Sequence, residues 1–96
     1  DMTNIPSQDT AALVLQLPTA PLSQIADIIR RDWKNPHFAA VPYIRAMLQC
    51  QSIEDSYIAE SARDITLYFL SNAANWRGPV AKVVKIELRR RLGLGS

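Results

Sequence analysis

Proline and glycine are distributed along this chain in a way that strongly limits what it can fold into. The six prolines occupy positions 6, 18, 21, 36, 42 and 79, whereas the three glycines occupy 78, 93 and 95. No apolar–polar alternation of strand length occurs, and apolar residues recur instead at intervals of three and four. Since proline stops a helix and fits well in the first turn of the next, this pattern predicts helices joined by proline-containing turns.

The apolar spacing predicts four or five short helices. We expect them over residues 7–17, 21–34, 42–49, 57–75 and 79–92. The helix over 57–75 has the longest apolar stripe, which steps by three or four through Ile58, Ala62, Ile65, Phe69, Ala73 and Trp76. Just before it, Ser52 and Asp55 have the spacing of a capping box, so at least one helical turn is expected to begin at Ser52.

Length and composition predict one domain with one core. The chain has 96 residues, of which 48% are hydrophobic and 21% charged, and a net charge of +2. Such a composition excludes a disordered polypeptide, and the length is that of a single domain. We therefore expect a compact all-α bundle spanning residues 1–96, with flexible ends over 1–6 and 94–96.

Membrane insertion, disulfides and bound metals are not indicated. No apolar run approaches the roughly 20 residues that span a bilayer, and no basic segment followed by an apolar stretch opens the chain. Cys50 is the single cysteine and His37 the single histidine, which is too few for a disulfide or a structural zinc site. We expect a cytoplasmic protein that inserts in no membrane and needs no metal or cofactor.

The sequence also lacks a recognisable catalytic arrangement. His37 lies in an expected turn, and Cys50 lies at an expected helix C-terminus, where the dipole raises the pKa of a thiol. Glu60 and Asp64 share a face of the predicted 57–75 helix, but no glycine-bearing loop or further oxygen ligands accompany them. We therefore expect a solvated acidic face there and a protein that is not an enzyme.

Trp33 and Trp76 each end a predicted apolar stripe, and each is followed by a basic residue. Stacking on bases next to a phosphate contact would suit a nucleic-acid-binding protein. The same positions would also suit a structural role, in which the two large side chains close the core and their indole N–H groups bind polar partners. Because both tryptophans lie on core stripes, away from the main basic cluster, we favour the structural interpretation.

Charge singles out the C-terminal helix. Residues 76–96 carry six basic groups and one acidic group, whereas residues 1–75 are net negative. At 100° per residue, the helix over 79–92 has one apolar face and one basic face centred on Ile86. We take as candidate partner-binding or nucleic-acid-binding residues Arg77, Lys82, Lys85, Ile86, Arg89 and Arg90. Basic residues are also favoured at the negative end of a helix dipole, so a solvated face remains an alternative.

Several short motifs lie between residues 22 and 92: Asp32-Trp33, Pro42-Tyr43 with Ala46-Met47, Leu70-Ser-Asn-Ala73 and Trp76-Arg77-Gly78. In these motifs the chain resembles a family of short, uncharacterised proteins encoded by bacteriophages, prophages and other mobile elements. That family has a glycine after the tyrosine matching Tyr57, where this chain has Ile58. The resemblance brings no catalytic residues, and it implies a small helical protein that binds a host or phage macromolecule.

Two functions follow as expectations. The first is a non-enzymatic phage or mobile-element accessory protein that acts by protein–protein binding against a host defence or regulatory factor. Wide apolar stripes on several helices also favour a homo-oligomer. The alternative is a small nucleic-acid-binding protein that uses the basic face of its last helix. We expect any such binding to be weak and non-specific, because no aromatic residues interleave with the basic ones.

Overall fold

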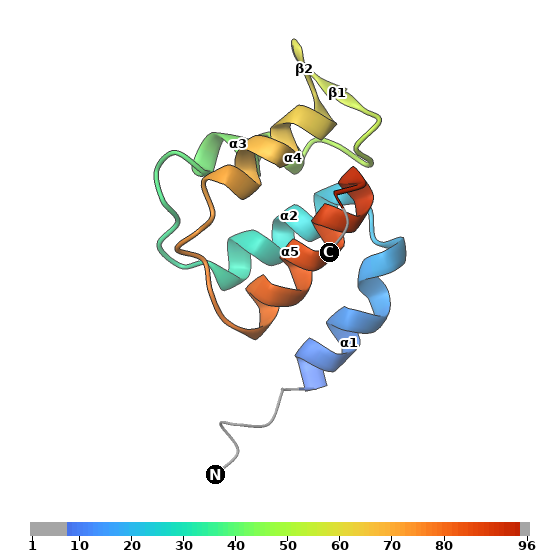
Figure 1. Cartoon of the computed structure of the whole chain (residues 1–96), viewed down its shortest axis with the longest axis vertical. Helices are drawn as coiled ribbons and strands as arrows, with labels where there is room; N and C mark the ends of the chain where they lie inside the picture. The colour runs from blue at the N-terminus through green and yellow to red at the C-terminus, as the bar shows by residue number, and fades with distance from the viewer. Residues whose placement is uncertain (1–7, 95–96) are drawn as a thin grey trace.

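The protein is described by a computed structural model over residues 8–94, with side chains over 11–94. Its α-helices are α1 (Gln8–Gln16), α2 (Leu22–Asp32), α3 (Val41–Met47), α4 (Ala62–Ser71) and α5 (Pro79–Leu92). A short 3-10 helix, η2 (Leu17–Thr19), follows α1. A two-stranded antiparallel hairpin, β1 (Ser56–Tyr57) with β2 (Glu60–Ser61), precedes α4. The described chain is mostly helical and forms one globule, but the hairpin departs from the all-α prediction (Figure 1).

Prolines stand at the starts of four helical elements. Pro21 is the N-cap residue of α2, and prolines also occupy the first turns of η2, α3 and α5. Proline fits in a first turn because its missing N–H would have no intrahelical partner there. Gly93 ends α5 with a positive φ of 76°, the left-handed conformation that glycine adopts easily. The predicted helices over 21–34, 42–49 and 79–92 are confirmed, as is that over 7–17 within the described residues.

The predicted helix over 57–75 is wrong at both ends. It begins only after Ser61, whose Oγ accepts a hydrogen bond from the N–H of Asp64 at 3.1 Å and caps α4. It ends at Asn72, whose Nδ2 donates to the carbonyl of Tyr68 at 2.8 Å. Ile58, expected on the apolar stripe, instead lies exposed in the turn of the hairpin. A serine cap therefore sets the start of this helix, although apolar residues continue at helical spacing before it.

The capping sequence Ser52–Asp55 forms a turn that leads into the hairpin. Asp55 Oδ2 accepts backbone N–H bonds from Gln51 at 2.7 Å and from Ser52 at 3.2 Å, as expected for a capping box. The carbonyl of Asp55 then accepts a bond from the N–H of Ala62 at 2.7 Å, which closes the base of the hairpin. A hydrogen-bonded turn forms here, but the helical turn predicted to begin at Ser52 does not.

The core lies between α2, α3, α4 and α5, and aromatic rings occupy its centre. The indoles of Trp33 and Trp76 stack with centroids 6.0 Å apart, and Phe69 meets each of them edge-on at 6.3 and 6.2 Å. The indole N–H of Trp76 donates to Asp32 Oδ2 at 2.8 Å. Both tryptophans are thus buried in the core, as predicted, and the expected polar partner is present for Trp76.

The helix α1 lies at the edge of this core, to which it adds Leu13, and along one side of α5 (Figure 1). Its main contacts are with η2 and α5. Leu13 and Leu17 are buried there, while Val14 and Leu15 are exposed, the latter to 83%. The first helix therefore carries more apolar surface than its packing covers.

The ends expected to be flexible are mostly outside the described residues, which exclude 1–7 and 95–96. Leu94 is described, and its backbone N–H donates to the carbonyl of Arg89 at 3.0 Å. Between residues 8 and 94, every helix is too short or too polar to cross a lipid bilayer.

Candidate functional site

The outward face of α5 combines basic side chains with one large aliphatic residue. Lys82, Ile86 and Arg89 follow one another at intervals of four and three, Arg90 lies four residues after Ile86, and all four are exposed. Ile86 is 57% exposed. Arg77, which precedes the helix, is exposed as well. Five of the six sequence-predicted site residues therefore lie on the surface, and four of them share one face of α5.

Lys85, the sixth predicted residue, turns inward. Its Nζ donates hydrogen bonds of 2.7 Å to the carbonyls of Ala73 and Trp76, in the segment that joins α4 to α5. Burial lowers the pKa of Lys85, and the nearby charges of Arg89 and Arg77 lower it further. The ammonium group therefore holds the end of a connecting segment, and its hydrogen-bonding capacity is largely used within the chain.

A buried carboxylate organises the other side of α5. Glu87 is 6% exposed, and its carboxylate accepts bonds from Arg90 at 2.9 and 2.7 Å and from Arg91 at 2.6 Å. Burial alone would raise the pKa of Glu87, but the hydrogen bonds from Arg90 and Arg91 outweigh it, so the pKa is lowered. Arg91 also donates to the carbonyl of Leu17, which ties α5 to η2.

Sequence reasoning did not single out Glu87 and Arg91. Their spacing of four residues on a predicted helix is the signal that could have found them. What the spacing could not give is the contact with Leu17, because that residue is far away in the sequence.

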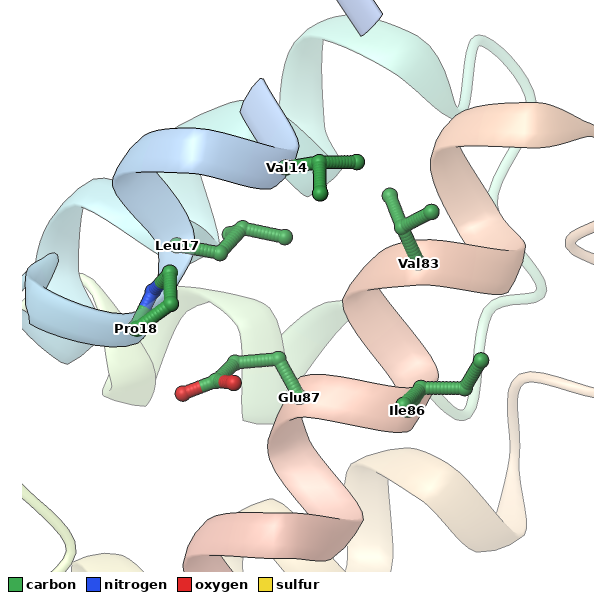
Figure 2. Close-up of a pocket in the computed structure, with 6 residues that line it drawn as sticks. All are labelled: Val14, Leu17, Pro18, Val83, Ile86 and Glu87. Carbon is green, nitrogen blue, oxygen red and sulfur yellow. The ribbon is translucent and has the colours of Figure 1, made fainter. Parts of the chain in front are cut away.

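An apolar groove runs between α1 and α5 beside this basic face (Figure 2). It has a volume of about 320 Å³ and is lined by Val14, Leu17, Pro18, Val83, Ile86 and Glu87. Val14 and Val83 point toward each other from the two helices, whereas Ile86 lies on the side of α5 farther from α1 (Figure 2). Ile86 thus belongs both to the basic face and to an apolar groove, whose lining offers van der Waals contact and one carboxylate already paired with arginine.

The residues weighed for catalysis lie apart from this groove. The His37 ring stacks on Phe38 with centroids 4.8 Å apart, and its Nδ1 accepts the N–H of Ala39 at 3.0 Å. A second hollow of about 210 Å³ is lined by His37, by the last residue of α4, Ser71, and by Asn72, Ala74 and Asn75 after it. Cys50 is fully buried, as expected of a packed residue. Burial raises the pKa of its thiol, and the negative charge of Asp55 raises it further.

The paired carboxylates expected on one helix face are separated in the structure. Glu60 belongs to β2 and Asp64 to the first turn of α4, so the prediction of an i,i+4 pair is wrong. The helix begins between the two residues, at the Ser61 cap. Both side chains are nevertheless exposed, close to the hairpin.

Comparison with protein-family models, curated proteins and solved structures finds no match. The resemblance to short phage-encoded proteins therefore stays a prediction, and the residues around the α1–α5 groove carry the functional interpretation.

Proposed function

We propose that this protein is a non-enzymatic binding protein whose partner is another protein, bound by the α1–α5 groove and the basic face of α5. The observation that carries the proposal is Ile86, an exposed aliphatic residue at the edge of an apolar groove and among basic side chains. A protein partner with an aliphatic anchor and acidic neighbours matches both properties, since charge steers the approach and apolar burial supplies affinity.

The setting that the sequence resemblance implies is consistent with this proposal. A short accessory protein of a phage or mobile element acts by binding a host defence or regulatory factor, and it needs a docking surface instead of a catalytic centre. The groove and the outward face of α5 would provide that surface.

Nucleic-acid binding remains the second candidate because Arg77, Lys82, Arg89 and Arg90 are exposed. Two observations weaken it. Lys85 uses its ammonium group on backbone carbonyls, and Arg90 is paired with Glu87. An aliphatic residue in the middle of the basic face also has no role in a phosphate contact.

A peptide titration distinguishes the two functions. The probe is a fluorescent helical peptide with leucines at i, i+3, i+4 and i+7 and glutamates on its other face, compared with a peptide in which lysines replace the glutamates. We expect the acidic peptide to bind with a Kd of about 10–100 μM and the basic peptide not to bind. Ile86→Asp is expected to weaken binding at least about tenfold, because it places a carboxylate in the apolar contact.

Phe38→Ser is the matched control, because Phe38 is equally apolar and 82% exposed but lies outside the groove. Random DNA is titrated in parallel. Submicromolar DNA binding at about 150 mM salt, lost when the exposed Arg77, Lys82, Arg89 and Arg90 are all changed to Gln but unaffected by Ile86→Asp, would establish the second candidate instead.

A further inference from the structure

The β1–β2 hairpin has a residue at its tip that folding alone does not favour. Ile58 has a φ of 58° and is 86% exposed. Ile58 and Ala59 form a two-residue loop, and a positive φ at only the first loop residue is typical of a type II′ turn, which normally has glycine there. A β-branched residue is strained in this conformation and gains no burial from it, so the tip is better explained by contact with another molecule.

The surroundings of Ile58 are acidic. Between residues 54 and 64 there are four acidic side chains and one basic side chain, Arg63. Arg63 is engaged within the chain, since it lies 3.6 Å from Glu54 and donates to the carbonyl of Leu92 at 3.1 Å. Glu60, which follows the tip in β2, and Asp64, in the first turn of α4 after the hairpin, are both exposed. The hairpin therefore presents an aliphatic side chain among negative charges.

The α1–α5 groove has the complementary properties. Ile86, one of its lining residues, is flanked on the exposed face of α5 by Lys82 and Arg89, neither of which has an ion-pair partner among residues 11–94. A cavity of about 150 Å³ with apolar walls already holds a benzene molecule, so a groove of about 320 Å³ admits an isoleucine side chain. Charge and apolar character thus match between two different surfaces of the same chain.

The hairpin cannot occupy the groove of its own molecule. Figure 1 shows the tip projecting beyond α3 and α4, away from α1 and from the middle of α5. A contact between the two surfaces therefore requires two molecules.

We propose that the groove binds the Ile58 hairpin of a second copy of this chain. Ile58 enters the apolar groove beside Ile86, while Glu60 and Asp64 face Lys82 and Arg89. This inference rests on the proposed function of the groove and names its partner. Because the two surfaces differ, the contact is head-to-tail, so a dimer keeps one unused groove on one molecule and one unused hairpin on the other.

Sedimentation velocity on the chain alone tests this proposal. Between about 10 μM and about 1 mM, a range suited to a small interface, we expect the average mass to rise with concentration. The rise is expected to be larger at about 50 mM than at about 500 mM salt, because the matched charges are screened. Ile58→Gly is expected to stay monomeric and to melt at a higher temperature, since it removes the anchor and relieves the strained φ.

The groove variant Ile86→Asp is also expected to stay monomeric. A 1:1 mixture of Ile58→Gly and Ile86→Asp is then expected to form dimers and nothing larger. Ile58→Gly supplies the one intact groove and Ile86→Asp the one intact hairpin, so a dimer has no intact surface left for a third molecule. Phe38→Ser, the matched exposed control, is expected to associate as the unchanged chain does. If Ile86→Asp melts early, the double variant Lys82→Glu, Arg89→Glu replaces it, since both residues are exposed.

Three results would overturn the inference: a monomeric unchanged chain at about 1 mM, undiminished association of Ile58→Gly, or a mixture of the two variants that forms no dimer. These results are separate from the peptide titration. If the chain is monomeric but binds the acidic peptide, the proposed function holds and a second copy is not the partner. If the chain associates but does not bind the peptide, self-association holds and the proposed function does not.

Discussion

Replacing Glu87 by glutamine tests how α5 is attached to the rest of the molecule. Glutamine keeps nearly the same shape but removes the charge and one acceptor from a carboxylate that accepts three hydrogen bonds from Arg90 and Arg91. The Arg90 side chain is 60% exposed, so solvent screens its pairing and the pairing adds little to stability. The Arg91 side chain is 14% exposed, and a charged hydrogen bond of that kind contributes about 1.5–3 kcal/mol. We expect Glu87→Gln to lower the free energy of unfolding by about 2–3 kcal/mol.

Asp27 supplies a matched control for this variant. It pairs with Arg30 and Arg31 at the same spacings of three and four residues, but on a more exposed face of α2. Asp27→Asn is expected to cost less than about 1 kcal/mol. Urea denaturation at pH 7 measures both variants. Equal losses for the two, or a loss below about 0.5 kcal/mol for Glu87→Gln, would refute the importance assigned to burial.

The same comparison depends on pH in a fixed direction. The folded pKa of Glu87 is lowered, because the hydrogen bonds from arginine outweigh the effect of burial. Its ionised form therefore stabilises the fold above the unfolded pKa of about 4.3, and this contribution is lost as the pH falls through the lower folded value. The difference in stability between the unchanged chain and Glu87→Gln is expected to shrink between about pH 5 and pH 2. A difference that stays constant over this range would contradict the reasoning.

Three further stability measurements follow from the structure. Phe69→Ala is expected to cost about 3–5 kcal/mol in a denaturant titration, because it empties a fully buried position between two indoles. Ile58→Gly is expected to stabilise the fold by up to about 1 kcal/mol. This value is the cost of a left-handed backbone at isoleucine, about 1–2 kcal/mol, reduced by the entropy that glycine loses on folding. Calorimetry at two protein concentrations separates this effect from association. Lys85→Gln is expected to cost about 1–3 kcal/mol, since two buried carbonyls lose their charged donor, whereas Lys82→Gln on the same helix is expected to be neutral.

Local rules account for the parts of the fold that the sequence predicts correctly. Pro42 and Pro79 place the starts of α3 and α5, and Gly93 places the end of α5, because these residues act within one turn of their own position. The hairpin was not predicted, because such local signals are absent from its turn. Its turn has Ile58 where a type II′ turn normally has glycine, so the sequence contains no turn signal there.

The candidate site likewise has some features that local sequence patterns predict and others that they do not. The exposure of Lys82, Ile86 and Arg89 follows from helical periodicity alone. The inward turn of Lys85 could not be predicted, because the carbonyls that it binds belong to the segment after α4. The groove itself requires α1 to lie beside α5, and no pattern within either helix specifies that pairing.

The peripheral position of α1 has a consequence for any ligand of the groove. This helix contributes Val14 to the groove wall that Leu17 and Pro18 of η2 complete, and its main contacts are with η2 and α5. Such an element can detach in a local opening reaction while the rest of the domain stays folded. Only molecules with α1 in place are competent to bind, so the observed Kd equals the intrinsic Kd divided by the fraction of such molecules. Affinity at the groove is thus set partly by Leu13, a buried residue of α1 that does not line the groove, because its packing determines how often the groove exists.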